Sequence, residues 1–351
     1  MNNSMSELWS RLGFLAIALV VYRIGTHIPI PGINPEQVAA LFQQSQGTIL
    51  QYFNLFSGGA LERMSIFALS VVPYISSAIV MQLFSNSVPY LQELKKDGQA
   101  GRNKITQYTR YGTVIFALIQ SSALTVTLQT AGLIDAGSIF SAFVAVISIV
   151  TGTMFLMWLG EQISERGIGN GISIIIATSI ITGVPRAFGQ ALEQTQQGDL
   201  NYLLLIVLAV LTLLVVAFVV FVENAQRKIT VNYAQRNQVR GMIQAPSSFL
   251  PLKLNMSGVI PAIFASTFLL FPASLSSWFG NIDGLGGLQE FSLYLNPGQP
   301  LYILLFVILI VSFCYIWLAL TFSSNDIAEN LKKGGAFIPG IRPGEQTASF
   351  I

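Results

Sequence analysis

The 351-residue sequence is poor in charge, with Asp, Glu, Lys and Arg making up only 10% of it, against about 25% in soluble domains. Its single cysteine, Cys314, excludes an intramolecular disulfide, and its single histidine, His27, excludes most catalytic and metal sites built on histidine. No HExxH, GxSxG or GxxxxGK[ST] motif is present, and nearly every Asp and Glu falls in a predicted loop or at a helix end. We therefore expect no catalytic residue, no metal and no cofactor: the chain is not an enzyme.

Apolar residues are abundant instead, at 52% of the chain with a mean hydropathy of +0.62. A transmembrane helix needs about 20 mostly apolar residues. The sequence predicts an all-α polytopic membrane protein with eight spans, at about 12–30, 65–85, 111–131, 140–160, 171–189, 202–222, 257–277 and 301–322. The first apolar run continues into IPIPGI without a small-residue cleavage site, so no cleavable signal peptide is expected.

Basic residues alternate sharply between the connections. Fifteen of them fall on one side: Arg11, Lys95, Lys96, Arg102, Lys104, Arg110, Arg166, Arg227, Lys228, Arg236, Arg240, Lys253, Lys332, Lys333 and Arg342. The other side receives only Arg63 and Arg186, while Arg23 lies within the first span. Since cytoplasmic loops carry the excess of Lys and Arg, we expect the N-terminus and the loops 86–110 and 223–256 to be cytoplasmic.

The stretch 56–84 is a candidate span that is interrupted. A Gly-Gly pair opens it, Glu62 and Arg63 follow, and Pro73 stands in its middle. A broken helix at bilayer depth is tolerated only where protein or a water-filled cavity surrounds it, so the chain is predicted to enclose a path. Because the first half of this stretch is too polar for a core, deleting Gly58–Phe67 is expected to raise ion leak without unfolding the protein.

A short internal echo supports a central constriction. Val71-Val72-Pro73-Tyr74-Ile75 and Val259-Ile260-Pro261-Ala262-Ile263 share a pattern and are five spans apart, as in inverted repeats. Val71 and Ile75 share a helix face, as do Ile172 and Ile176. With Ile263 they form a candidate ring of branched aliphatic side chains, which can gate a pore by dewetting. The alternative is ordinary helix packing.

Polar side chains within the spans offer a second feature. Ser76, Ser77 and Gln82 lie on span two, and Gln120 and Ser121 on span three. Hydrogen bonds between membrane helices are worth about 0.6 kcal/mol on average. A seam held by such contacts, rather than by interlocked small residues, is expected to be able to open. Arg23 is expected to snorkel or to pair with backbone carbonyls.

Two further segments have competing interpretations. Gly167, Gly169 and Gly171 spell GxGxG, but no strand precedes them, so a turn between helices is favoured over a nucleotide site. The loop 223–256 is either a plain topology signal or a docking arm with an apolar root. Its basic tip, Arg236 to Arg240, would suit an acidic protein surface or RNA phosphate.

Long motifs in order along the whole chain then resemble the SecY family, the central subunits of bacterial protein-conducting channels. They are YRIGTHIPIPGI, FNLFSGGALERMSIFALSVVPYISSAI, GRNKITQYTRYGT, GTMFLMWLGEQISERGIGNGISI, PLKLNMSGVIPAIFAS and GAFIPGIRPGEQTA. The resemblance implies ten spans in two inverted five-helix halves around an hourglass pore. Here the halves would be 1–190 and 191–351, the second truncated after span eight. The chain stops at Ile351, and we expect the intact protein to be longer.

The resemblance also implies roles for individual residues. Segment Phe56–Leu69 matches the plug helix, with Phe56, Ser57, Gly58, Gly59, Ala60, Leu61, Glu62, Arg63, Met64, Ser65, Ile66 and Phe67 as its candidate residues. Val71, Ile75, Ile172, Ile176 and Ile263 match the pore ring, although isoleucine is commoner at the position of Val71. Ser76, Gln82 and Gln120 are assigned to a lateral gate of spans two, three, seven and eight. Arg236, Arg240 and Arg342 match positions that engage the ribosome or the SecA motor.

The implied function is a channel that translocates unfolded secretory polypeptides and releases membrane helices sideways into lipid. Implied partners are SecE, SecG, the SecA motor ATPase, the ribosome with its RNA near the tunnel exit, signal peptides, nascent chains and lipids. The implied location is the cell inner membrane, with a cytoplasmic N-terminus. A secondary transporter of small solutes is the main alternative; an intramembrane protease and a ribosome-docking scaffold are weaker ones.

Overall fold

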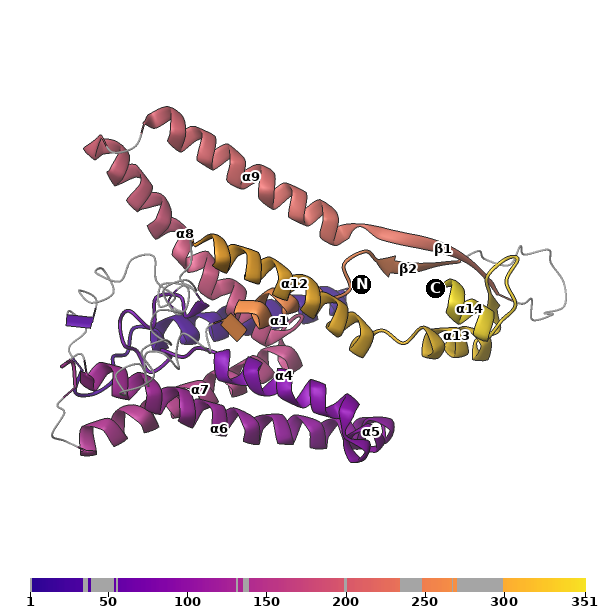
Figure 1. Ribbon diagram of the computed structural model, residues 1–351, viewed down its shortest axis with the longest axis horizontal. Coiled ribbons are helices and arrows are strands. Elements are labelled where there is room, and N and C mark those ends of the chain that lie inside the picture. Colours follow the sequence, from indigo (N-terminus) through magenta and orange to yellow (C-terminus); the bar gives the residue numbers. More distant parts are fainter. Residues whose placement is uncertain are drawn as a thin grey trace. The chain divides into compact units, whose positions relative to one another are not determined.

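Long helices make up most of the computed structural model, with a small β-sheet (Figure 1). It describes residues 2–33, 37–38, 54, 56–130, 132–134, 139–198, 201–233, 248–266, 268–269 and 299–351. The chain divides into two compact units, Met1–Gln194 with Ser266–Phe306 and Thr195–Ala265 with Val307–Ile351.

The first unit is an array of antiparallel helices. It contains α1 (Asn2–Gly25), α4 (Val72–Ser87), α5 (Pro89–Lys96), α6 (Gln99–Thr130), α7 (Ile139–Arg166) and nearly all of α8 (Gly171–Gln197). Helix α6 packs against both α4 and α7, and α1 packs against α7. A bidentate ion pair between Arg110 and Glu161, at 2.9 and 2.8 Å, fastens α6 to α7.

The glycine-rich turn between α7 and α8 is confirmed as a tight connection. Gly169 has a φ of +70°, in the left-handed region that glycine adopts without strain. Asn170 then caps α8, because its Oδ1 accepts hydrogen bonds from the backbone N–H of Ile172 and Ser173. A Cβ on Gly171 would overlap the carbonyl oxygen of Gly160, so glycine lets the two helices approach closely here.

Helix α4 begins seven residues later than the predicted span 65–85. Residues 57–71 form turns, and the helix starts at Val72 with Pro73 in its first turn. Proline has no N–H to donate and its φ suits a first turn, so it starts this helix and does not interrupt one. The predicted mid-span break is therefore wrong: the break precedes the helix.

The second unit contains α9 (Tyr202–Asn224), most of α12 (Pro300–Thr321) and a three-stranded sheet. The strands β1 (Gln226–Tyr233), β2 (Ser248–Lys253) and β3 (Ala336–Phe337) are antiparallel in the order β2-β1-β3. Gln226 pairs with Lys253 at one end of the hairpin. Within the described chain, none of the 23 residues of α9 is buried, as expected for a helix that faces lipid.

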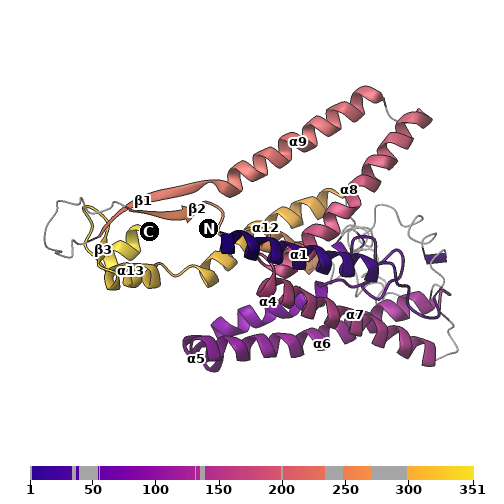
Figure 2. The ribbon, with the colours of Figure 1, turned by 180° about the vertical axis from the view of Figure 1, so that it is seen from behind.

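The chain after α12 folds back onto the hairpin. Helices α13 (Ser324–Lys333) and α14 (Glu345–Phe350) pack together, and α13 packs against β3 (Figure 2). Ile229 and Val231 on β1 form a buried cluster with Ala336 and Ile338. The apolar root predicted for the loop 223–256 is thus the core of a small sheet domain.

Six helices in the described residues are long and apolar enough to cross a membrane: Met5–Gly25, Gln99–Gln129, Ile139–Arg166, Gly171–Gln197, Tyr202–Asn224 and Pro300–Lys333. They agree with six of the eight predicted spans. Helix α4 has only 16 residues, and much of the seventh predicted span, 257–277, lies outside the described residues. The count of eight and the five-helix halves stay predictions.

Candidate functional site: a buried turn segment over an aliphatic cluster

Residues 56–71, here called the turn segment, lie among α1, α7 and α8 and form successive turns, not the predicted plug helix. The premise that this segment is too polar for a core is wrong. Half of the twelve candidate plug residues are buried: Ser57, Ala60, Leu61, Met64, Ser65 and Phe67. Leu61 and Met64 belong to one apolar cluster and Ala60 and Phe67 to another. Deleting Gly58–Phe67 would therefore remove core side chains, and we expect it to destabilise the first unit.

Backbone hydrogen bonds attach the turn segment to the chain that follows α1. Ile30 donates to the carbonyl of Met64 at 2.9 Å, and Ile66 donates to the carbonyl of Ile28 at 3.0 Å. These two bonds flank a single antiparallel bridge between Pro29 and Ser65. Backbone bonds do not depend on side-chain identity, so this attachment could not be predicted from the sequence pattern.

Phe67 occupies an aromatic slot, the space between Tyr22 on α1 and Phe155 on α7. Its ring lies parallel to both, with centroid distances of 6.2 Å to Tyr22 and 5.8 Å to Phe155. Glycines make room for it: a Cβ on Gly25 would overlap the Phe67 ring. Stacked aromatic pairs contribute about 0.5–1.5 kcal/mol each beyond the area they bury, so the slot is a substantial anchor.

Glycines also mark the contacts with the other two helices. On α7, a Cβ at Gly152 would overlap the carbonyl oxygen of Ile66. Towards α8, a Cβ at Gly58 of the turn segment would lie 3.1 Å from Thr182 Oγ1 and 3.2 Å from Ser179 Cα. The turn segment therefore approaches α1 and α7 at distances that only glycine permits, and it lies tightly against α8 at Gly58.

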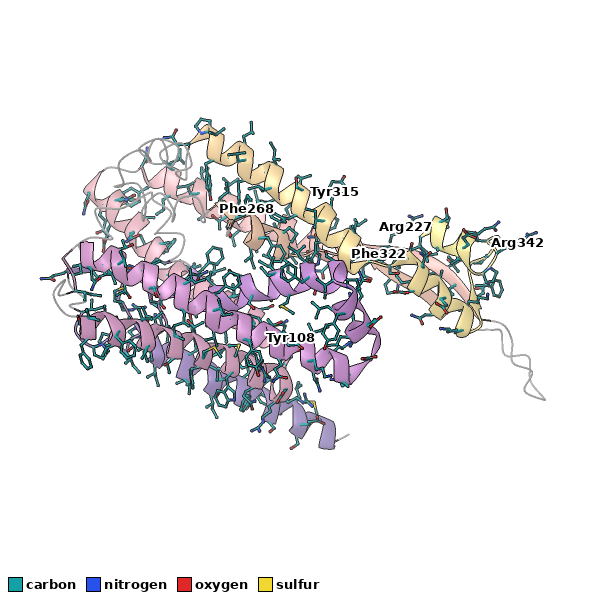
Figure 3. The ribbon with its side chains drawn as sticks, turned by 60° about the horizontal axis from the view of Figure 1, so that its bottom comes forward. Tyr108, Arg227, Phe268, Tyr315, Phe322 and Arg342 are labelled. Carbon is teal, nitrogen blue, oxygen red and sulfur yellow. The ribbon has the colours of Figure 1, made fainter. Side chains whose placement is uncertain are left out.

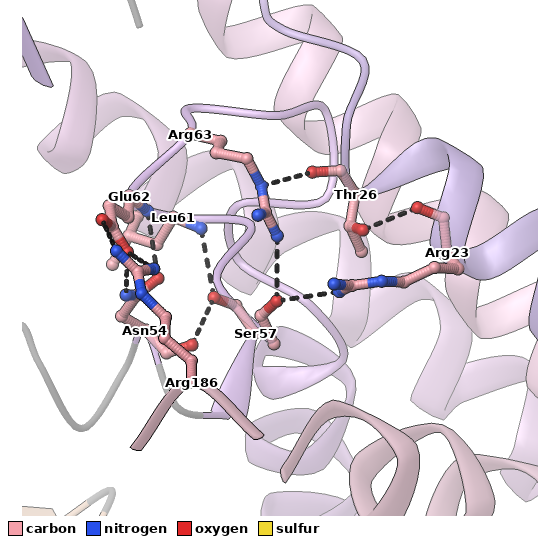
Figure 4. A network of polar contacts seen from close by, with 9 residues as sticks. Arg23, Thr26, Asn54, Ser57, Leu61, Glu62, Arg63 and Arg186 are labelled. Carbon is pink, nitrogen blue, oxygen red and sulfur yellow. Dashed lines mark hydrogen bonds and ion pairs between the residues drawn. The ribbon is translucent and has the colours of Figure 1, made fainter. Parts of the chain in front are cut away.

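Two guanidinium groups converge on the carbonyl oxygen of Gly58 (Figure 4). Arg23 donates to it at 3.2 Å and Arg63 at 3.1 Å, and Arg63 also donates to the carbonyl of Thr26 at 3.3 Å. The prediction that Arg23 pairs with backbone carbonyls is confirmed. Thr26 directly follows the C-terminal end of α1, where positive charge is favoured by the helix dipole.

Tyr22 adds a buried polar link between three parts of the site. Its hydroxyl lies 2.6 Å from Ser179 Oγ on α8 and donates to the carbonyl of Ser57 at 3.3 Å. Ser179 itself donates to the carbonyl of Ile175 one turn earlier, so the hydroxyl groups of Tyr22 and Ser179 are both paired.

Glu62 and Arg186 form a bidentate ion pair between the turn segment and α8 (Figure 4). Arg186 Nη1 and Nη2 donate to the two carboxylate oxygens at 2.7 and 2.8 Å, and Asn54 Nδ2 donates to Oε2 at 3.0 Å. Burial raises the pKa of the Glu62 carboxyl, but the bonds from Arg186 and Asn54 outweigh it and hold the pKa below its ordinary value. The sequence analysis missed this pair, although Arg186 is one of only two basic residues predicted on its side.

Four of the five candidate ring residues meet in one apolar cluster. Val71, which is 1% exposed, is buried there, and Ile75, Ile172 and Ile176 pack against the same cluster. Ala60 and Phe67 of the turn segment belong to it as well. Ile263, the fifth residue, lies in the second unit, where its N–H donates to the carbonyl of Val259 at 3.3 Å.

The internal echo extends to the backbone. Pro261 is the second residue of the helical stretch 260–266, just as Pro73 is the second residue of α4. The residues two positions before the helices match too, because Ser70 has a φ of +51° and Gly258 a φ of +59°. A left-handed residue therefore precedes both helices, and at Ser70 it is a non-glycine whose buried hydroxyl has no hydrogen-bond partner among the described residues.

The residues assigned to the lateral gate lie on α4 and α6 without meeting one another through hydrogen bonds. Ser76 Oγ donates to the carbonyl of Val72 one turn earlier, and Gln82 is half-buried. Gln120 Oε1 is buried and accepts no hydrogen bond from the described residues. The contrast drawn between polar contacts and interlocked small residues is wrong for α4 and α6. Between these helices, Ser77 Oγ donates a hydrogen bond to the carbonyl of Thr109 at 2.7 Å, and a Cβ on Gly112 would overlap Ser77 Oγ. The same contact is therefore both a polar contact and a close approach of small residues.

The docking candidates fall in the second unit. Arg342 is exposed in the turn between β3 and α14 (Figure 3). Arg227 of β1 lies 5.6 Å from the ring centroid of Phe350. Arg236 and Arg240 lie outside the described residues. No group of histidine, cysteine and carboxylate side chains that could hold a metal occurs in the described ranges.

The chain has the fold of a solved protein-conducting channel. A solved SecY structure, in which the plug domain is described as stabilizing the closed state of the translocation channel, superposes with a TM-score of 0.67 at 18% identity. The superposition covers 98% of this chain and 80% of that chain.

Comparison of sequences identifies the family. The SecY family model matches residues 65–351. The protein translocase subunit SecY of Pseudomonas aeruginosa is 58% identical over 100% of this chain and 79% of its own length. That of Escherichia coli K12 is 55% identical over 99% of this chain and 79% of its own length. The chain belongs to the SecY family.

Proposed function

We propose that this chain forms the protein-conducting channel of a translocase and moves unfolded polypeptides across or into a membrane. The identity of 58% to a translocase subunit along the whole chain is the observation that carries this proposal. Nothing in the comparisons supports a transporter of small solutes. The chain acts as a passage, not as an enzyme.

The pore ring consists of Val71, Ile75, Ile172, Ile176 and Ile263. The gathering of the first four in one cluster supports this assignment. Branched aliphatic side chains make no polar demands on the cargo, so they suit polypeptides of any sequence. A narrow apolar neck also sheds water readily and so resists ions.

Residues Phe56–Leu69 of the turn segment are the plug. Their burial against the cluster that contains Val71 supports this role, because in this position they cover the ring residues of the first unit. The close contacts at Gly25, Gly58 and Gly152 make the surface on which the plug packs, here called the seat, specific in shape. The lateral gate is formed by spans two, three, seven and eight, with Ser76, Gln82 and Gln120, and admits signal sequences and membrane helices to lipid.

The protein lies in the inner membrane with its N-terminus in the cytoplasm. The basic loops then face the cytoplasm, where Arg236, Arg240 and Arg342 engage the ribosome or the SecA motor, and SecE and SecG complete the channel. The exposure of Arg342 beside the small sheet supports a docking role.

Crosslinking to a stalled secretory chain tests the cargo and the path together. In a Cys314→Ser background, Ile75→Cys and Ile263→Cys should each crosslink to the chain in transit. Leu213→Cys is the matched control, because this α9 side chain is 70% exposed and expected to face lipid. Crosslinks at the control alone would contradict both the ring and the channel.

A further inference from the structure

The ion pair between Glu62 and Arg186 joins two elements that also meet at the aliphatic cluster and where Gly58 lies against Ser179 and Thr182. Among the ion pairs of the described residues, it alone connects the turn segment to a helix. The carboxylate receives three hydrogen bonds, two of them in the bidentate geometry that arginine favours. Such charge-assisted pairs are about twice as strong as neutral hydrogen bonds.

The position of the pair gives it mechanical meaning. Helix α8 carries Ile172 and Ile176 near its start, and Arg186 follows ten residues after Ile176, about 15 Å further along the axis. Within the turn segment, the chain continues from Glu62 to Val71, and Val71 packs in the same cluster as Ile172 and Ile176. Two segments are therefore joined at both of their ends: residues 62–71 of the turn segment and residues 176–186 of α8. They are joined at one end by apolar packing of Val71 with Ile176 in this cluster and at the other end by the ion pair between Glu62 and Arg186.

A displacement of α8 away from α4 at the cluster must either carry the turn segment with it or break this pair. The carrying route is opposed, because the segment is also bonded to the chain after α1 and held in the aromatic slot. We infer that Glu62 and Arg186 form a latch that keeps the turn segment seated while the cluster is closed and that opens when the cluster widens. The sealing consequence of the latch rests on the proposed function.

The two partners of the latch are not equivalent. The Glu62 side chain is 12% exposed and the Arg186 side chain 55%. Removing Glu62 lets the arginine turn into solvent, whereas removing Arg186 leaves a largely buried carboxylate with Asn54 as its remaining donor. A buried charge without its partner is strongly destabilising, so Arg186→Gln should unseat the segment more than Glu62→Gln.

Thiol labelling measures seating directly. In the complex isolated from membranes and reconstituted in vesicles, with Cys314→Ser, an Ala60→Cys reporter sits where the native side chain is 0% exposed. Its reaction with a membrane-impermeant maleimide reports an unseated segment. Glu62→Arg and Arg186→Glu should each raise the labelling rate by about tenfold or more, because each places like charges together. The double exchange restores the pair and should return the rate to within about threefold of the parent.

The exposed pair Glu329–Lys333, with side chains 61% and 69% exposed, supplies the matched control. Reversing either of its charges should leave labelling unchanged. Equal labelling of all Glu62 and Arg186 variants, or failure of the double exchange to restore protection in a protein that elutes as a single species, would overturn the latch. Ion leak is recorded in parallel: labelling that follows the charges while leak stays constant upholds the latch and refutes the sealing role of the segment.

Discussion

Replacing Gly152 with alanine should unseat the turn segment without altering α7. The added Cβ would overlap the carbonyl oxygen of Ile66 and lie 2.7 Å from its carbonyl carbon, so backbone must move. Overpacking of this kind costs about 1–3 kcal/mol, which shifts the balance between seated and unseated states by roughly 5- to 150-fold. The gain in helix propensity from glycine to alanine cancels, because α7 is helical in both states.

Conductance of the resting complex in planar lipid bilayers is the assay, with Gly189→Ala as the control because nothing lies within 4 Å of a Cβ there. A second glycine sharpens the test. At Gly25 the added Cβ meets the ring of Phe67, whereas at Gly152 it meets backbone first. Phe67→Leu should therefore reduce the leak caused by Gly25→Ala but not the leak caused by Gly152→Ala. Wild-type leak in Gly152→Ala, or equal rescue of both variants, would refute the seat as described.

Three other predictions concern strain, acidity and docking. Ser70→Gly should raise the free energy of unfolding by about 0.5 kcal/mol, since it relieves a left-handed serine. Gly258→Ala should lower the free energy of unfolding by about 1 kcal/mol, because it places a Cβ on a left-handed residue. Thermal unfolding in detergent measures both changes, and a change opposite in sign to either expectation would argue against the backbone echo. Because the pKa of Glu62 is held below its ordinary 4.5, the stability that its pair contributes is fully present above that value and is lost as the pH falls through the lower pKa of the folded protein. The difference in Tm between wild type and Glu62→Gln should accordingly shrink only in acid, and a pH-independent difference would contradict the pair. Arg342→Glu should impair motor-driven secretion by reversing an exposed docking charge, and normal secretion of a SecA-dependent substrate would remove Arg342 from that role.

Features that depend on local sequence are predictable in this chain. Six spans follow from hydropathy, and the turn before α8 follows from Gly169 and the cap at Asn170. The start of α4 is a partial failure, because Pro73 carries two opposite meanings: it breaks a helix from within and begins one at its first turn. Composition alone did not decide between them.

Contacts between distant residues are a different matter. Glu62 and Arg186 carry opposite charges and Arg186 is one of two basic residues predicted on its side, but nothing in a single sequence states that they meet. The burial of Phe67 was not predicted, because the charged residues Glu62 and Arg63 indicate a solvated segment. In the structure Glu62 pairs with Arg186, and Arg63 donates to backbone carbonyls. Polarity in a membrane protein can thus mark a core that is held by specific pairing.

The separation of 124 residues between Glu62 and Arg186 also sets an order of events during synthesis. At the usual rate of about 5–20 residues per second, Arg186 is made roughly 6–25 s after Glu62. Both residues of the bridge between Pro29 and Ser65 have been synthesised by the time Ser65 is added. The α7 residues that contact the turn segment are made later, and Arg186 later still. Among the contacts of the turn segment described above, the growing chain therefore acquires the Glu62–Arg186 ion pair last, once the fifth of its predicted spans has been made.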